Sequence, residues 1–347
     1  MNTSRAVLVR LLGGVGLMVA LALPAATAAA GEAETAEEVL QYFVVPRTEA
    51  LARAAALQAE AWPAFCAAPS QAWAAEVRRR FAEVVEAWAA VEVVRFGPVA
   101  EASRHERLNF HPERRNATGR AVAGLLAGAE RAMPDRGTVA QASVAGQGLG
   151  ALERILHDPE AAGMAEGTPA GRRRCAVGAA IAAAVAATAR ETAEGWGHGD
   201  PSTRLGPREV LVRSLTDLVT FYRGLVEVRI KPVVGDAPGA GDHRAAAFWR
   251  AGLADRTTAV NLAAGEALAS ILASGHLEAE AALRHAAAAR EVADGLEAPL
   301  AELAADPARR HRALMLFAAV RDAHNRLLEV LPEALGVTVG FNSLDGD

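Results

Sequence analysis

The 347-residue sequence contains 36 Lys and Arg against 41 Asp and Glu, a formal net charge of −5, and is 52% hydrophobic and 5% aromatic. This length and apolar content suit one large or two ordinary globular domains and exclude a mainly disordered chain. The basic residues form no extended block, so the chain lacks the electrostatic footprint of a nucleic-acid-binding protein.

The first thirty residues have the pattern of a secretory signal peptide. Arg5 and Arg10 precede an apolar run over residues 11–23, and a stretch of small residues follows over 25–30. This order of charged, apolar and small-residue regions predicts cleavage near residue 30 and export to the periplasm or cell envelope. We expect no membrane span after the signal is removed. The alternative is an uncleaved N-terminal anchor.

The chain has two cysteines, Cys66 and Cys175. Export to an oxidising compartment favours a disulfide between them, and two buried free thiols are the alternative. Neither the C-x-x-C spacing of a redox pair nor that of a zinc ribbon is present.

The chain after residue 30 is predicted to be all-α, because its apolar residues recur at helical spacing and no segment alternates like a strand. Three stripes carry this prediction: Trp73, Val77, Phe81, Val84, Trp88 and Val91; Leu211, Leu215, Leu218, Tyr222 and Leu225; and Leu314, Phe317, Val320, Leu328 and Leu331.

The longest break lies over residues 195–207, which include several glycines and prolines. We therefore expect two antiparallel four-helix-bundle-like halves that form an internal pseudo-repeat, with boundaries at 31–199 and 200–347. A single array of eight helices is the alternative.

The segment 146–156 combines glycines with an inward carboxylate. Glu153 shares a helical stripe with Leu149 and Leu156, so it is predicted to face the apolar interior, where it needs a partner or a shifted pKa. Glycine at positions such as Gly148 and Gly150 indicates close approach of another backbone or of a ligand.

Arg95 continues the stripe of Trp88 and Val91 and is predicted to point inward as well. A pair between Arg95 and Glu153 would satisfy both charges. Such a pair fits a ligand site, or a buried ion pair that fixes helix register.

His105 and His111 are six residues apart, so they cannot share a helix face as an H-E-x-x-H zinc motif requires. We interpret this segment as a polar loop with surface histidines. The alternative is that His111 supplies a ligand nitrogen.

Several segments together resemble the imelysin-like family of bacterial cell-envelope proteins, also classed as M75 peptidases. In chain order they are Arg95-Phe96-Gly97-Pro98, Arg107, Phe110-His111-Pro112-Glu113, Gly148-Leu149-Gly150-Ala151-Leu152-Glu153, Phe248-Trp249-Arg250-Ala251-Gly252, Asn261, and the ending Gly340-Phe341-Asn342-Ser343-Leu344-Asp345-Gly346-Asp347.

The resemblance implies an exported, all-helical protein with two bundle-like halves, associated with iron acquisition. The family motif G-x-H-x-x-E is matched by Gly148 and Glu153, but Gly150 stands where the histidine is expected. This departure removes the best transition-metal ligand of the motif. A hydrolytic zinc site needs about three protein ligands and an open position, and no clustered ligand spacing supplies them.

We therefore expect a binding or accessory protein of the envelope, linked to iron acquisition. Its pocket is predicted to be lined by six residues: Arg95, Arg107, His111, Gly148, Gly150 and Glu153. The ligand would be a small anion, a metal chelate or an envelope partner. The cofactor is unknown: iron or another metal stays open, although no clear ligand set supports it. The alternatives are a metal-dependent M75 peptidase and a non-catalytic structural or partner-binding protein.

Overall fold

The computed structural model of this protein describes residues 31–127, 133–197 and 205–338. The expected signal peptide at 1–30 and the terminal motif at 340–347 lie outside these ranges. Within them the chain forms helices and no β-strand, which confirms the all-α prediction.

The helices are α2 (Val45–Ala67), α3 (Gln71–Ala89), α4 (Arg104–Leu108), α5 (Ala117–Leu126), α6 (Arg136–Ala140), α7 (Leu149–His157), α8 (Ala162–Ala165), α9 (Pro169–Gly197), α10 (Pro207–Gly224), α11 (Lys231–Val234), α12 (Ala254–Leu272), α13 (Glu280–Asp294), α14 (Leu300–Ala305) and α15 (Arg310–Ala334), with π-helices η1 (Val39–Val44) and η7 (Leu225–Ile230).

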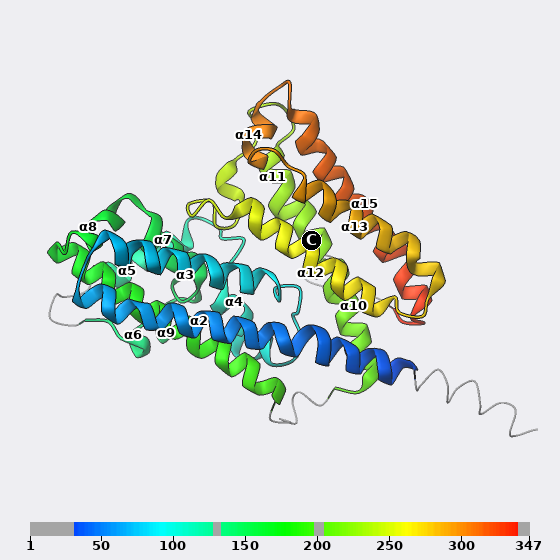
Figure 1. The fold of residues 1–347 in the computed structure, drawn as a ribbon, viewed down its shortest axis with the longest axis horizontal. Helices are drawn as coiled ribbons and strands as arrows, with labels where there is room; N and C mark the ends of the chain where they lie inside the picture. Colours follow the sequence, from blue (N-terminus) through cyan, green and yellow to red (C-terminus); the bar gives the residue numbers. More distant parts are fainter. Residues whose placement is uncertain (1–30, 128–132, 198–204, 339–347) are drawn as a thin grey trace, which may run out of the picture.

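Two groups of long helices pack against each other (Figure 1). In the N-terminal group, α2 lies along α9, and α3 and α7 pack beside them. In the C-terminal group, α13 and α15 lie side by side, and α12 and α10 complete the packing. Helix α12 also contacts α3 and η1, which joins the two groups. An internal repeat that relates the groups stays a prediction, as do the domain boundaries.

The side chains of α3 show why this segment is helical and where it ends. The Ser70 hydroxyl accepts the Trp73 backbone N–H at 3.2 Å and caps the first turn. Four predicted stripe residues are fully or almost fully buried, namely Val77, Phe81, Val84 and Trp88. The helix ends at Ala89, and turns follow over residues 90–93.

The predicted stripe of the last helix is only partly right. Leu314 and Leu328 are each 43% exposed, whereas Leu316 and Leu327 face the core. Val320 and Leu331 are buried as expected. The buried face of α15 is therefore rotated slightly from the predicted one, because alanines as well as leucines fill the contact with α13.

The disulfide between Cys66 and Cys175 is present, with a Cα–Cα distance of 5.7 Å, and it joins α2 to α9. The same two helices meet closely at Gly178, where a Cβ atom would lie 2.2 Å from the ring of Trp62. Glycine there lets the fully buried Trp62 pack against the α9 backbone.

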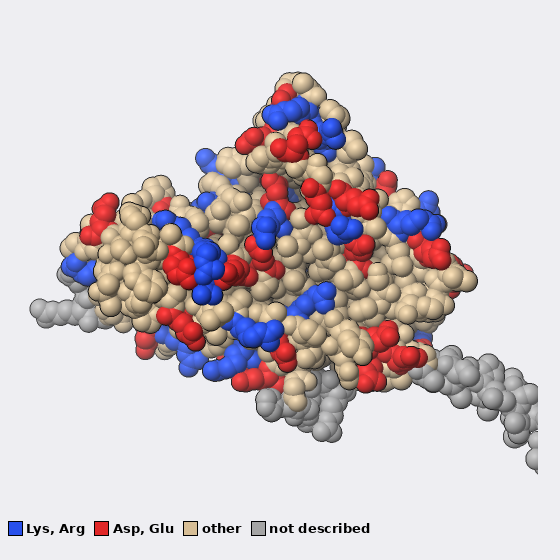
Figure 2. Space-filling model, viewed as in Figure 1, with Lys and Arg blue, Asp and Glu red and all other residues tan. Residues whose placement is uncertain are grey.

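Helix α9 alone among the described helices is long and apolar enough to cross a membrane. Within the protein, 67% of its most apolar window is buried, and it packs against α2 and α7 as a core helix does. Figure 2 shows acidic and basic side chains interspersed over one face of the molecule, without a broad patch of one sign.

Candidate functional site

A cavity of about 330 Å³ lies where the two helical groups meet. Its N-terminal wall comes from the loop after α4 and from the starts of α5 and α7, and its C-terminal wall comes from η7 and the segment 244–250. The polar and charged residues that line it are Asn109, His111, Glu113, Thr118, Glu153, Arg154, Glu227, Arg244 and Arg250. The π-helical turn of η7 belongs to this wall, and such turns occur frequently at functional sites.

Glu153 is the most deeply buried acid in this wall, with 4% of the residue exposed. Its Oε1 accepts the Ala251 backbone N–H at 3.1 Å, and its Oε2 lies 4.0 Å from Nη1 of Arg250. Burial raises the pKa of Glu153 to about 7, although the Ala251 N–H and the Arg250 charge act in the opposite direction. The side chain is therefore close to half protonated at neutral pH and can donate or accept a hydrogen bond.

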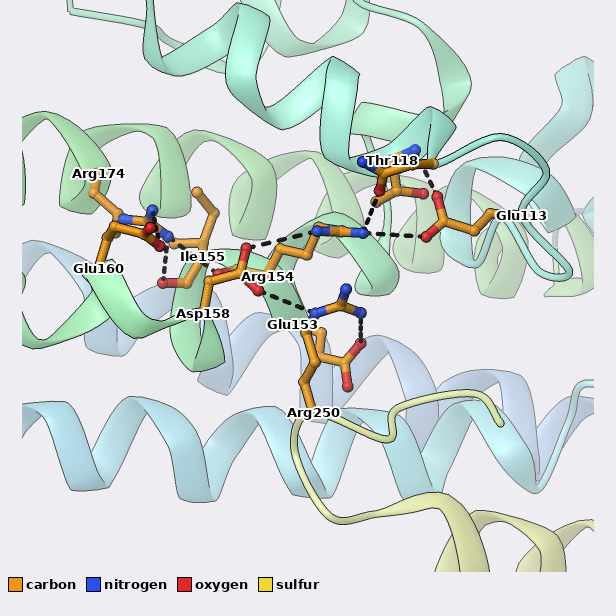
Figure 3. A network of polar contacts seen from close by, with 10 residues as sticks. Glu113, Thr118, Glu153, Arg154, Ile155, Asp158, Glu160, Arg174 and Arg250 are labelled. Atoms are coloured by element: carbon orange, nitrogen blue, oxygen red, sulfur yellow. Dashed lines mark hydrogen bonds and ion pairs between the residues drawn. The ribbon is translucent and has the colours of Figure 1, made fainter. Parts of the chain in front are cut away.

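Glu153 is one end of a chain of charges, which we call the Glu153 network (Figure 3). Arg250 reaches from the 243–252 segment to α7 and donates to Asp158 at 3.0 Å. Oδ2 of Asp158 also lies 3.7 Å from Nη1 of Arg154. Nη2 of Arg154 in turn donates to Oε1 of Glu113 at 3.4 Å. The network links the two helical groups beside the cavity, so the geometry of the cavity depends on their docking.

Two nitrogens in the cavity wall are buried without a hydrogen-bond partner among the described residues, Nε2 of His111 and Nδ2 of Asn109. Burial lowers the pKa of His111 to about 4, and the Arg229 charge acts in the same direction. The imidazole is therefore neutral at physiological pH. The prediction of surface histidines is wrong, because His111 is half-buried in the wall and His105 is 7% exposed.

Arg244 supplies a positive charge at the rim. The residue is exposed, and its guanidinium lies 5.9 Å from the ring centroid of Trp249. Unlike Arg154 and Arg250, it forms no ion pair with any residue in the described parts of the chain. The cavity therefore presents one arginine, Arg244, that pairs with no carboxylate in the described parts of the chain.

The structure brings together three of the six predicted site residues, because His111, Gly150 and Glu153 all line the cavity. Gly148 lies behind it, where a Cβ atom would be 2.5 Å from the carbonyl oxygen of Leu108, so a second backbone does approach closely there. Arg107 donates to Gln147 at 3.1 Å and supports the same loop. The roles of the predicted site residues in binding stay predictions.

The expected pair between Arg95 and Glu153 is not formed, and Arg95 does not point inward. Helix α3 ends at Ala89, so the helical stripe does not extend to Arg95, which is exposed. The backbone N–H of Arg95 donates to Asp217 at 2.6 Å. The partner of Glu153 comes instead from Arg250 and Ala251, about a hundred residues along the chain.

A second buried carboxylate, Glu92, forms what we call the Glu92 cluster with Arg229 and Asn261. Arg229 donates to Oε1 of Glu92 and, at 2.7 Å, to Oδ1 of Asn261. The amide of Asn261 donates to Oε2 of Glu92 at 3.2 Å and to the carbonyl oxygen of Ala89 at 2.8 Å. Burial opposes the ionisation of Glu92, but the charge of Arg229 and weaker positive charges around it outweigh burial and hold the pKa of Glu92 below its usual value.

Sequence reasoning missed Arg244, Arg250 and the Glu92 cluster as parts of this junction. Arg250 and Asn261 belong to segments that carry the family resemblance, and this was the available signal. Glu92 and Arg229 had no comparable signal, because neither belongs to a recognisable motif.

The donor set does not fit a resident metal ion. No group of three or more His, Cys, Asp or Glu side chains in the described parts of the chain is arranged to hold one. Gly150, in place of the motif histidine, contributes no side-chain ligand to the cavity it lines.

The fold and this cavity define an all-helical protein with a charged pocket at the junction of two helical groups. The model of the imelysin family (peptidase M75) matches residues 44–327. The chain therefore belongs to the imelysin family.

The fold is shared with solved structures, among them the following two. The crystal structure of an imelysin-like protein from Psychrobacter arcticum 273-4 has a TM-score of 0.73 and 19% identity, covering 90% of this chain and 98% of that chain. A protein from Parabacteroides distasonis ATCC 8503, assigned as an iron-regulated protein A precursor, has a TM-score of 0.65 and 12% identity, covering 88% of this chain and 95% of that chain. No curated protein matches the sequence significantly.

Proposed function

We propose that this protein is an exported binding or accessory protein of the bacterial envelope, linked to iron acquisition, which holds a small anionic ligand or metal chelate in the cavity around Glu153. The observation that carries the proposal is the position of Glu153. Its carboxyl group is buried in the wall of a cavity of about 330 Å³, and its pKa is raised to about 7. Buried titratable groups with such shifts are typical of functional sites.

The charge of the cavity favours an anion. Arg154 pairs with Glu113 and shares Asp158 with Arg250, and Glu227 is paired with Lys231 outside the cavity. The positive charges of Arg154, Arg244, Arg250 and Lys231 then face the carboxyl groups of Glu113, Glu153, Asp158 and Glu227. Because the pKa of Glu153 is raised to about 7, its negative charge is reduced near neutral pH, and the charge of Arg244 is not fully cancelled. A carboxylate-bearing ligand would pair with Arg244 and accept hydrogen bonds from the protonated Glu153 and from Asn109.

A chelate suits this site better than a bare metal ion. The described residues supply no set of three donors, whereas a chelate brings its own donors and presents anionic oxygens to the protein. The link to iron rests on the family and on the relative assigned as iron-regulated. Export rests on the signal-peptide pattern of residues 1–30.

The proposal is tested by calorimetric titration of the mature chain with citrate and with ferric citrate. We expect binding of at least one of them, and about a tenfold loss of affinity in Arg244→Gln, because a charge-assisted hydrogen bond is removed. Arg284→Gln is the matched control, because Arg284 is an exposed arginine on α13 whose ion pair is with Glu280. Equal affinities in the two variants, or no binding of either compound, would contradict the proposal.

A further inference from the structure

A second, smaller cavity of about 190 Å³ lies within the C-terminal group. The segment 243–252 separates it from the Glu153 cavity, since Ala246, Ala247 and Trp249 line both. Its other walls are the end of η7, α11, the start of α12 and the start of α14. Most of the lining is apolar, from Val233, Ala246, Ala247, Trp249, Ala254, Pro299, Leu300 and Ala301.

Two fixed charges face this mainly apolar space, and they differ in their partners. The guanidinium of Arg229 already donates hydrogen bonds to Glu92 and Asn261 in the Glu92 cluster. Asp255 is half-buried, and its Oδ2 accepts the backbone N–H of Leu300 at 3.3 Å. No cation in the described parts of the chain pairs with Asp255.

Asp255 lies in the first turn of α12, where the helix dipole favours its negative charge, but burial and a neighbouring carboxylate disfavour it. Burial raises its pKa, and the nearby charge of Glu302 acts in the same direction, while the Leu300 N–H opposes both. A carboxylate in an apolar enclosure is stabilised when a cation pairs with it. The remaining aromatic and aliphatic walls would bury the apolar body of the molecule that carries the cation.

We propose that this cavity binds a small organic ammonium ion, with its charged nitrogen on Asp255 and its apolar body against Trp249 and Leu300. The size sets the class of ligand, because an apolar cavity of about 150 Å³ is enough for benzene. One ring or one branched aliphatic chain therefore fills the space. The site is separate from the proposed anion site, and neither proposal depends on the other.

The test compares benzylamine with benzyl alcohol, which share a ring and differ in charge, by calorimetric titration of the mature chain near neutral pH. We expect benzylamine to bind at least about tenfold more tightly than benzyl alcohol, since the ammonium forms a charge-assisted hydrogen bond. Asp255→Asn should remove this preference and leave the affinity for benzyl alcohol within about twofold. The asparagine retains an oxygen that can accept the Leu300 N–H, so the fold should be preserved.

Glu302→Gln is the matched control, because Glu302 lies near Asp255 without lining the cavity, and it should keep the preference for benzylamine. In Ala301→Leu a larger side chain on α14 fills part of the cavity, so the variant should bind both compounds more weakly. This variant tests the site without changing Asp255. Glu153→Gln should leave benzylamine binding unchanged. Equal binding of the two compounds, a preference that persists in Asp255→Asn, or no binding of either would overturn the proposal.

Discussion

Glu92 and Glu153 are buried to the same extent, with 3% and 4% of each residue exposed, yet their pKa values move in opposite directions. Glu92 has both oxygens occupied by Arg229 and Asn261, and its pKa is lowered. Glu153 has one backbone donor and an arginine at 4.0 Å, and its pKa is raised to about 7. The two pKa values therefore differ because of the partners of the two carboxylates and not because of their burial: the charge of Glu92 is compensated, and that of Glu153 is compensated only in part.

The largest effect is expected from breaking the Glu92 cluster. Glu92→Gln leaves the buried guanidinium of Arg229 without a counter-charge, and we expect the free energy of unfolding to fall by about 3–5 kcal/mol. Urea denaturation measures this change. The double variant Glu92→Gln/Arg229→Met removes both charges and should recover part of the loss. A loss below about 1 kcal/mol in Glu92→Gln would show that the cluster does not stabilise the junction.

Removing the charge of Glu153 is expected to raise the free energy of unfolding near neutral pH, whereas removing the charge of Glu92 lowers it. Its folded-state pKa of about 7 exceeds the ordinary value of 4.5, so the folded protein holds a proton that the unfolded chain releases. Its contribution to stability is fully present below about pH 4.5 and is lost as pH rises through about 7, by about 3 kcal/mol in all.

Glu153→Gln mimics the protonated form at every pH. We expect it to match the native protein at about pH 4 and to exceed its stability by up to about 3 kcal/mol at about pH 8. Denaturation curves at the two pH values give the difference between variant and native protein, which cancels the other titrating groups. A variant that is less stable than the native protein at the higher pH would place Glu153 with Glu92 as a structural residue.

The smallest effect on stability is expected at Gly150. A substitution there tests whether an added side-chain ligand lets the cavity bind a metal ion. A Cβ atom there would lie 3.9 Å from Thr118 and 4.0 Å from Asn109, which is ordinary contact. Gly150→His should therefore change the free energy of unfolding by less than about 1 kcal/mol. It adds an imidazole to the cavity that His111 and Glu153 already line, and Zn(II) affinity should rise at least about tenfold. Gly150→Gln is the control without an imidazole, and equal Zn(II) affinity in the two variants would refute the expected gain.

Local patterns predicted much of this molecule. The stripe of Leu149 and Leu156 placed Glu153 in the interior, and the exported context led to the disulfide between Cys66 and Cys175. Both inferences needed only helical periodicity or the chemistry of a compartment.

The partners of the buried charges were beyond such reasoning. Arg250 meets Glu153, and Arg229 meets Glu92, only because the two helical groups dock. Periodicity does not encode docking, and it failed for Arg95 because the helix ended six residues earlier than the apolar stripe suggested. The terminal motif at 340–347 contributed to the family resemblance and lies outside the described residues.

We propose that the Glu153 cavity takes an anionic chelate and not a bare metal ion. Equilibrium dialysis of the mature chain, purified without a metal-affinity tag, against Fe(II) alone and against ferric citrate tests it directly, with elemental analysis of iron and a separate assay of citrate. We predict that iron is retained only together with citrate. Stoichiometric iron retained from Fe(II) alone would contradict the account, because the cavity would then hold the metal with donors of the protein.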